Sequence, residues 1–191
     1  MTAQLYDFLY EDISLKTVGL VVGLALVLGH LAALLKPEPV RAWLKALPRN
    51  EKFGLGLVVI DFAWALLVWS EMDLGEFYNV ERPVQLILVA GCIGVMIYVR
   101  EFLAVRAIGF FFILAAAPIL DAAFLEPPQS RLLLVALSYA WIIIGMFWVG
   151  MPYLMRDQID WALAKAKRWK PLVLAGLVYG ALVLGCAVAF Y

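Results

Sequence analysis

Six long apolar runs recur along this chain of 191 residues, and they constrain its fold more than any other feature. Each run has about 17 to 24 residues, enough at roughly 1.5 Å rise per residue for a helix to cross a hydrocarbon core about 30 Å thick. Because lipid offers no water to backbone groups, each run is expected to be a helix, and the alternating pattern of membrane strands is absent. The predicted spans are 17–35, 53–70, 83–99, 107–124, 132–155 and 171–191.

The composition agrees with a lipid environment. Hydrophobic residues make up 65% of the chain and charged residues 16%, whereas about a quarter of the residues of a soluble domain are charged. The segment Met1 to Lys16 lacks the basic start of a cleavable signal peptide, so the first helix is expected to remain in the mature protein. We therefore predict one polytopic membrane domain over residues 1–191, an all-α bundle of six transmembrane helices.

Positive charge alternates between the connections. The first, third and fifth connections carry 12 of the 15 Lys and Arg residues, and the other side keeps Lys16, Arg82 and Arg131. Basic residues in short loops are retained on the cytoplasmic face. The pattern therefore predicts that both termini face outward, with the plasma (inner) membrane as the expected location.

Two of the inner connections are predicted to form short amphipathic helices at the membrane surface. The first has apolar Val40, Trp43, Leu44 and Leu47 flanked by Arg41 and Lys45, and the second interleaves Ile159, Trp161, Leu163 and Trp169 with Lys165, Lys167, Arg168 and Lys170. Such a composition suits an anionic inner leaflet. Orientation of the protein is the simpler interpretation, and recognition of a specific lipid or partner is the alternative.

Two ionisable residues lie deep within predicted spans, where a charge costs about 2.5 to 3.5 kcal/mol on insertion scales. Asp61 is in the second span and His30 in the first, at comparable distances from the inner surface. If they meet, they would form a coupled pair able to accept or pass a proton. The alternative is a structural hydrogen bond between two helices.

Two further polar groups are candidates for binding. Asp121 follows Pro118, which frees a backbone carbonyl one turn earlier, so this place is a candidate cation site or simply a kink near the outer surface. Arg100, Glu101 and Arg106 crowd a short inner turn and are candidate contacts for an anionic headgroup. Ordinary inner-surface charges that fix orientation are the alternative for these three.

Paired glycines four residues apart indicate close helix packing. They are Gly19 and Gly23 in the first span and Gly176 and Gly180 in the last. Small residues at this spacing let two backbones approach, either within one chain or between subunits.

The scarcity of polar residues decides between function classes. The chain has four Ser, two Thr, two Asn and four Gln, too few to line a path for sugars, amino acids or hydrated ions. No catalytic motif, metal-ligand set or nucleic-acid pattern is recognisable, so no catalytic residue and no metal is assigned, and the cofactor is left unknown.

Three hypotheses remain. The leading one is an accessory or structural subunit of a membrane complex, with the bilayer and other subunits or further copies as partners. The second is a small proton or cation transporter using Asp61 and His30. The third is a lipid-binding protein or lipid-modifying enzyme, although an enzyme is the less favoured expectation.

Overall fold

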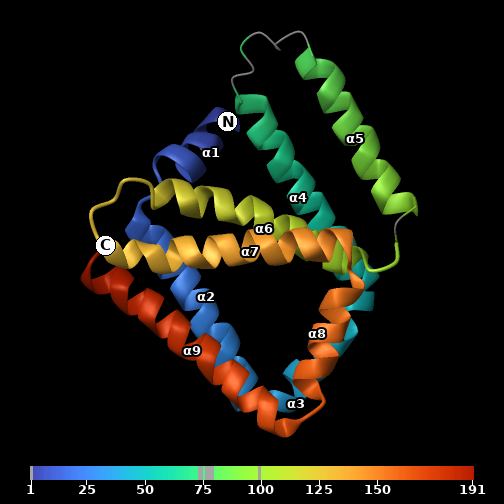
Figure 1. The fold of residues 1–191 in the computed structure, drawn as a ribbon. Helices are drawn as coiled ribbons and strands as arrows, with labels where there is room; N and C mark the ends of the chain where they lie inside the picture. Colours follow the sequence, from blue (N-terminus) through green and yellow to red (C-terminus); the bar gives the residue numbers. More distant parts are fainter. Residues whose placement is uncertain (1, 73–74, 76–79, 99) are drawn as a thin grey trace.

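The computed structural model describes residues 2–72, 75, 80–98 and 100–191, except the side chains of 81 and 166, and this part of the chain is helical without strands (Figure 1). The elements are α1 (Thr2–Tyr6), η1 (Asp7–Glu11), α2 (Leu15–Leu35), α3 (Pro37–Ala46), η2 (Leu47–Arg49), α4 (Glu51–Glu71), α5 (Glu81–Tyr98), α6 (Leu103–Ala122), η4 (Gln129–Arg131), α7 (Leu132–Gly150), α8 (Tyr153–Leu163) and α9 (Ala166–Ala189).

Five of the described helices are long and apolar enough to cross a membrane: α2, α4, α6, α7 and α9. The third predicted span, 83–99, corresponds to α5, whose apolar part, Arg82–Tyr98, is shorter than the others. Residue 99 and most of the connection before α5 lie outside the described residues. An all-helical protein with several apolar spans is thus the architecture, and the sixth span stays a prediction.

Several predicted boundaries differ from the helix ends, and two of the differences reach five residues. The fifth span was expected to reach Met155, but α7 ends at Gly150 and α8 begins at Tyr153, because Pro152 has no backbone N–H to continue the helix. The last span was expected to begin at Pro171, yet α9 starts at Ala166 and includes this proline. Trp169, predicted to lie on an interfacial helix, therefore belongs to α9.

The N-terminal segment, 2–11, is helical, which the sequence analysis did not predict. One contact within the segment and one contact with α4 hold it in place. Tyr6 stacks on Tyr10 with ring centroids 4.8 Å apart, and the Tyr10 hydroxyl accepts a hydrogen bond from Trp64 Nε1 at 2.9 Å. The segment therefore packs beside α4.

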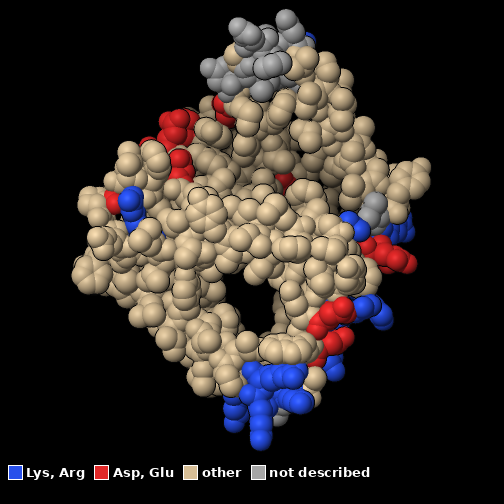
Figure 2. Space-filling view, viewed as in Figure 1, with Lys and Arg blue, Asp and Glu red and all other residues tan. Residues whose placement is uncertain are grey.

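The short helix α3 forms where it was predicted, and its apolar face packs onto the start of α9. Val40 and Leu44 of α3 pack against a cluster that includes buried Trp169. The guanidinium of Arg41 lies 5.1 Å from the Trp169 ring centroid, a cation–π contact. Figure 2 shows Lys and Arg side chains gathered where α3, α8 and α9 meet, at the lower tip of the molecule.

The antiparallel helices α2 and α9 approach closely at glycines. A Cβ atom at Gly23 would lie 2.8 Å from the backbone N of Leu184, and one at Gly180 would lie 2.7 Å from Leu26 Cβ. Gly19 and Gly176 lie in the same interface. The four glycines singled out in the sequence thus all face the α2–α9 contact within one chain.

The other helix pairs use the same device. A Cβ at Gly109 of α6 would lie 2.7 Å from the carbonyl oxygen of Gly145 on α7. A Cβ at Gly145 would likewise lie 2.6 Å from the carbonyl oxygen of Gly109. A Cβ at Gly54 of α4 would lie 2.6 Å from the backbone N of Ala104 on α6. Each of these helix crossings therefore requires glycine, which has no Cβ atom, at the point of closest approach.

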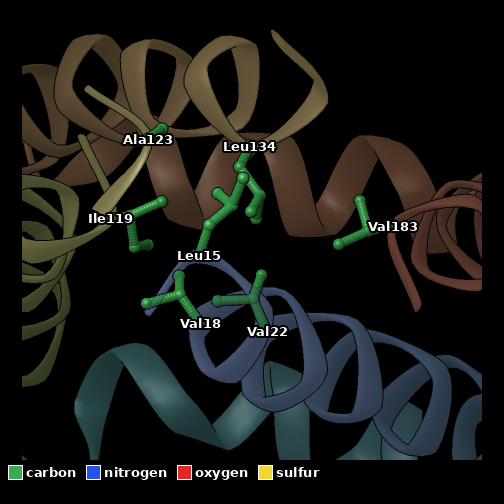
Figure 3. Packing of buried hydrophobic residues seen from close by; sticks show 7 residues of the cluster. All are labelled: Leu15, Val18, Val22, Ile119, Ala123, Leu134 and Val183. Carbon is green, nitrogen blue, oxygen red and sulfur yellow. The ribbon is translucent and has the colours of Figure 1, made fainter. Parts of the chain in front are cut away.

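A buried cluster joins the α2–α9 pair to the α6–α7 pair at one end of the molecule (Figure 3). It comprises Leu15, Val18, Val22, Ile119, Ala123, Leu134 and Val183. Two tyrosine hydroxyls reinforce this end, donating from Tyr179 to the Leu133 carbonyl at 2.6 Å and from Tyr191 to the Ser130 carbonyl at 2.7 Å. Both termini and the 123–131 connection lie at this side, opposite α3 and α8 (Figure 1).

Candidate functional site

Asp61 lies about 15 Å along α4 from its first residue, taking the standard helical rise. The helix begins sharply because the Asn50 side chain accepts a hydrogen bond from Phe53 N at 3.1 Å. Asp61 is two turns beyond Gly54, which packs on the α6 backbone, and one turn before Trp64, whose ring meets Phe111 of α6 edge-on at 5.9 Å. The carboxyl therefore lies on the face of α4 that packs against α6.

The Asp61 side chain is removed from solvent and has no hydrogen bond. The residue is only 6% exposed, and neither carboxyl oxygen has a partner among the described atoms. Most buried polar groups in proteins are satisfied, so an orphaned carboxyl in an apolar span is the most unusual polar feature of the fold.

His30 does not meet Asp61. Its Nδ1 donates to the Leu26 carbonyl, 2.7 Å away on its own helix, and the rest of the ring covers the backbone of Gly176 on α9. The predicted coupled pair is therefore not formed: the histidine is part of the α2–α9 interface, whereas the aspartate belongs to the α4–α6 interface.

A cavity of about 920 Å³ opens between the N-terminal segment, α4 and α5. We call it the α4–α5 cavity. Leu5, Leu9, Leu67, Leu86 and Val89 give it apolar walls. Its polar lining groups include Ser70, Arg82 and Gln85, and these lie near the end of α4 and the start of α5. One end of the cavity is therefore polar and cationic, whereas the remainder is apolar.

The N-terminal segment closes one side of this cavity through the Tyr10–Trp64 hydrogen bond. Burial raises the pKa of the Tyr10 phenol above its ordinary value of 10.0, and the Trp64 hydrogen bond offsets part of that increase. The phenol is therefore neutral at physiological pH, which suits a residue packed at an apolar wall.

The structure does not bring together Arg100, Glu101 and Arg106, the three residues predicted to contact an anionic headgroup. Arg106 donates from Nη1 to the Val149 carbonyl at 2.7 Å, so it satisfies a carbonyl near the C-terminal end of α7. Arg100 and Glu101 are exposed in the short turn before α6. The three side chains are thus not gathered around one ligand position.

A different basic cluster forms at the inner-loop end, from residues far apart in the sequence. Lys45, Arg49 and Arg156 line a cavity of about 240 Å³ together with Asp160 and Phe102. Phe102 has φ 56°, a left-handed conformation unusual for a residue other than glycine. Only the packing of α3, η2 and α8 brings these groups together, so no sequence signal marks them.

Asp121 and Pro118 lie near the end of α6. The proline is buried within the helix, which continues to Ala122, and Asp121 is exposed. Across the described part of the chain, no group of three or more His, Cys, Asp or Glu side chains is arranged to hold a metal ion.

The sequence singled out Asp61 by its type and position, but it missed the α4–α5 cavity. Arg82 and Gln85 were visible only as polar residues at the start of a span, and no structure was predicted for the N-terminal segment that lines the cavity. No protein-family model, curated protein or solved structure matches the chain.

Proposed function

We propose that this protein binds a membrane amphiphile with an anionic headgroup in the α4–α5 cavity. The observation that carries the proposal is a mostly apolar cavity whose lining includes Arg82, Ser70 and Gln85 near the end of α4 and the start of α5. Its volume of about 920 Å³ lies in the range of ligand sites, which are mostly apolar with a few polar groups that orient the ligand.

The lining fits the two halves of such a molecule. Acyl chains would contact Leu67, Leu86 and Val89, gaining the favourable packing of apolar groups. Arg82 would pair with an acidic headgroup, because a guanidinium offers two parallel donors to a phosphate or carboxylate. Within the described residues α5 packs mainly against α4, so the ligand enters sideways from the lipid rather than through an aqueous path.

We further propose six spans and outward-facing termini in the plasma membrane. The apolar part of α5 is shorter than the other spans, but at helical rise it still measures about 25 Å. The uneven distribution of Lys and Arg supports the orientation. Single cysteines at positions 2 and 190 test it: a membrane-impermeant maleimide added to intact cells labels both if the termini face outward, and labels neither in the opposite orientation.

Lipid retention tests the ligand. The wild-type protein, extracted in mild detergent and studied by native mass spectrometry, is expected to carry an anionic lipid. Val89→Trp, which fills the cavity, should lose it, whereas Ile87→Trp on the same helix should keep it, because Ile87 is 68% exposed and outside the lining. Equal lipid content in the two variants would overturn the proposal.

The headgroup has its own test. Arg82→Gln is expected to lower retention of anionic lipids at least several-fold and to leave neutral lipids unchanged. Unchanged selectivity would remove Arg82 from recognition. Stoichiometric foreign subunits in the same spectra, without lipid, would instead favour the accessory-subunit hypothesis, which stays a prediction.

A further inference from the structure

Asp61 is a buried polar residue that the proposed lipid site does not use. It is not among the residues lining the α4–α5 cavity, and its neighbours along α4 place it in the contact with α6. On either side of Asp61, α6 meets α4 through Ala104, which packs on Gly54, and through Phe111, which packs on Trp64, and neither side chain offers a hydrogen-bond donor.

The ionisable groups on the surrounding elements are engaged or lie elsewhere. On α6, Arg106 donates to the α7 carbonyl of Val149, and Asp121 is exposed near the opposite end of the helix. On η1, Tyr10 accepts from Trp64, and Asp7 and Glu11 carry the same sign of charge as an ionised Asp61.

On α5, Arg82 is a lining residue of the cavity at the start of the helix, and Cys92 and Tyr98 complete the described titratable side chains of that helix. No ion pair among the described residues includes Asp61, and its two oxygens have no hydrogen bond. A carboxylate in this position would have neither a counter-ion nor a donor.

We infer that Asp61 is a proton-binding site within the membrane, occupied as the neutral carboxylic acid between α4 and α6. A buried charge without a partner is far more costly than a neutral polar group, so proton uptake is the least costly way to place this side chain in lipid. This inference stands apart from the proposed lipid site and rests on the burial and the missing partners of one residue.

A neutral carboxyl in lipid has a distinctive reactivity towards dicyclohexylcarbodiimide, which partitions into membranes. The acid proton moves to one carbodiimide nitrogen while the carboxyl oxygen bonds to the central carbon. In the resulting O-acylisourea the acyl group then shifts from oxygen to nitrogen, breaking its C–O bond and forming a C–N bond. The stable N-acylurea contains all atoms of both reactants.

The test uses the full-length protein in sealed lipid vesicles, treated with this reagent at pH 5 to 9 and mapped by peptide mass spectrometry. We expect Asp61 to be the principal modified residue, with labelling retained at pH 8, where water-exposed carboxyls with ordinary pKa values of about 4 are ionised and do not react. Asp61→Asn should abolish the label, and Asp121→Asn, the matched control on α6, should leave it unchanged.

Three outcomes would overturn the inference. The first is an unmodified Asp61 in the folded wild-type protein, a result that needs no variant to fold. The second is labelling that disappears between pH 5 and 6, as for a water-exposed carboxyl. The third is protection by Na⁺ or K⁺ at constant pH, which would identify a metal cation rather than a proton as the occupant.

Discussion

Replacement of Gly23 by alanine should destabilise the α2–α9 pair, and the chain provides its own control. A Cβ at Gly23 would lie 2.8 Å from the N atom and 2.9 Å from the Cα atom of Leu184. Both are backbone atoms, so no side-chain rotation can relieve the contact and the two helices must separate. Gly29 lies on the same helix, but an added Cβ there meets nothing within 4 Å.

Two opposing effects set the magnitude. Alanine is favoured over glycine within a helix by about 0.8 to 1 kcal/mol, and this gain applies to both substitutions. Overpacking of a close contact costs about 1 to 3 kcal/mol, and this applies to Gly23→Ala alone. We therefore expect Gly23→Ala to be less stable than Gly29→Ala by about 1 to 3 kcal/mol.

The assay is reversible unfolding in mixed micelles at increasing dodecyl sulfate fraction, followed by circular dichroism. Because the two variants add the same methyl group to the same helix, the difference between their free energies of unfolding isolates the steric cost of the α2–α9 contact. Stabilities equal to within about 0.5 kcal/mol, the usual limit for an uncoupled surface substitution, would refute this account of the interface.

The remaining predictions concern single polar contacts. Arg106→Gln should lower the free energy of unfolding by about 1 to 2 kcal/mol, because it removes the charged donor to the Val149 carbonyl of α7. Arg100→Gln at the exposed turn should change the free energy of unfolding by less than about 0.5 kcal/mol. Tyr179→Phe, which removes the 2.6 Å hydrogen bond to Leu133, should cost about 0.6 kcal/mol in the same unfolding assay, as is typical within membrane bundles. Because the Tyr10 pKa is raised in the folded protein, its stabilising contribution is complete below about pH 10 and is lost as the pH rises through the folded pKa. Wild type should therefore lose stability more steeply than Tyr10→Phe in unfolding measured from pH 9 to 12, and parallel curves would exclude this linkage.

Where prediction failed, a contact between distant residues decided the local structure. The helix of the N-terminal segment depends on the Tyr10–Trp64 hydrogen bond, which joins residues 54 positions apart. The early start of α9 is supported by Trp169, which is 7% exposed and packs in one cluster with Ala33 of α2 and Val173 of α9. Proline at position 171 removes only one helical hydrogen bond, and this tertiary packing offsets the loss.

The sequence identified Asp61 as a candidate residue but did not identify its surroundings. Asp61 could be selected because an acid within an apolar run is costly wherever the helix packs. Its pairing with His30 was inferred from equal depth alone, and depth does not fix which face of a helix a residue occupies. Rotation about the α2 axis, set by the glycines, turns His30 towards Gly176 of α9 instead.

The amino-acid sequence alone indicates a helical protein with several apolar spans, because within lipid such runs of membrane length satisfy their backbone groups by forming helices. It also indicates close helix contacts at the glycine pairs 19/23 and 176/180, whereas the close contacts at Gly54, Gly109 and Gly145 were not predicted. Three features emerge only from the three-dimensional packing: the helix that each glycine contacts, the unpartnered position of Asp61 in the α4–α6 contact, and the largely apolar cavity beside α4 that Arg82 also lines. These features depend on the rotation of each helix about its axis and on packing between distant residues. Such interactions produce no repeating pattern in the amino-acid sequence.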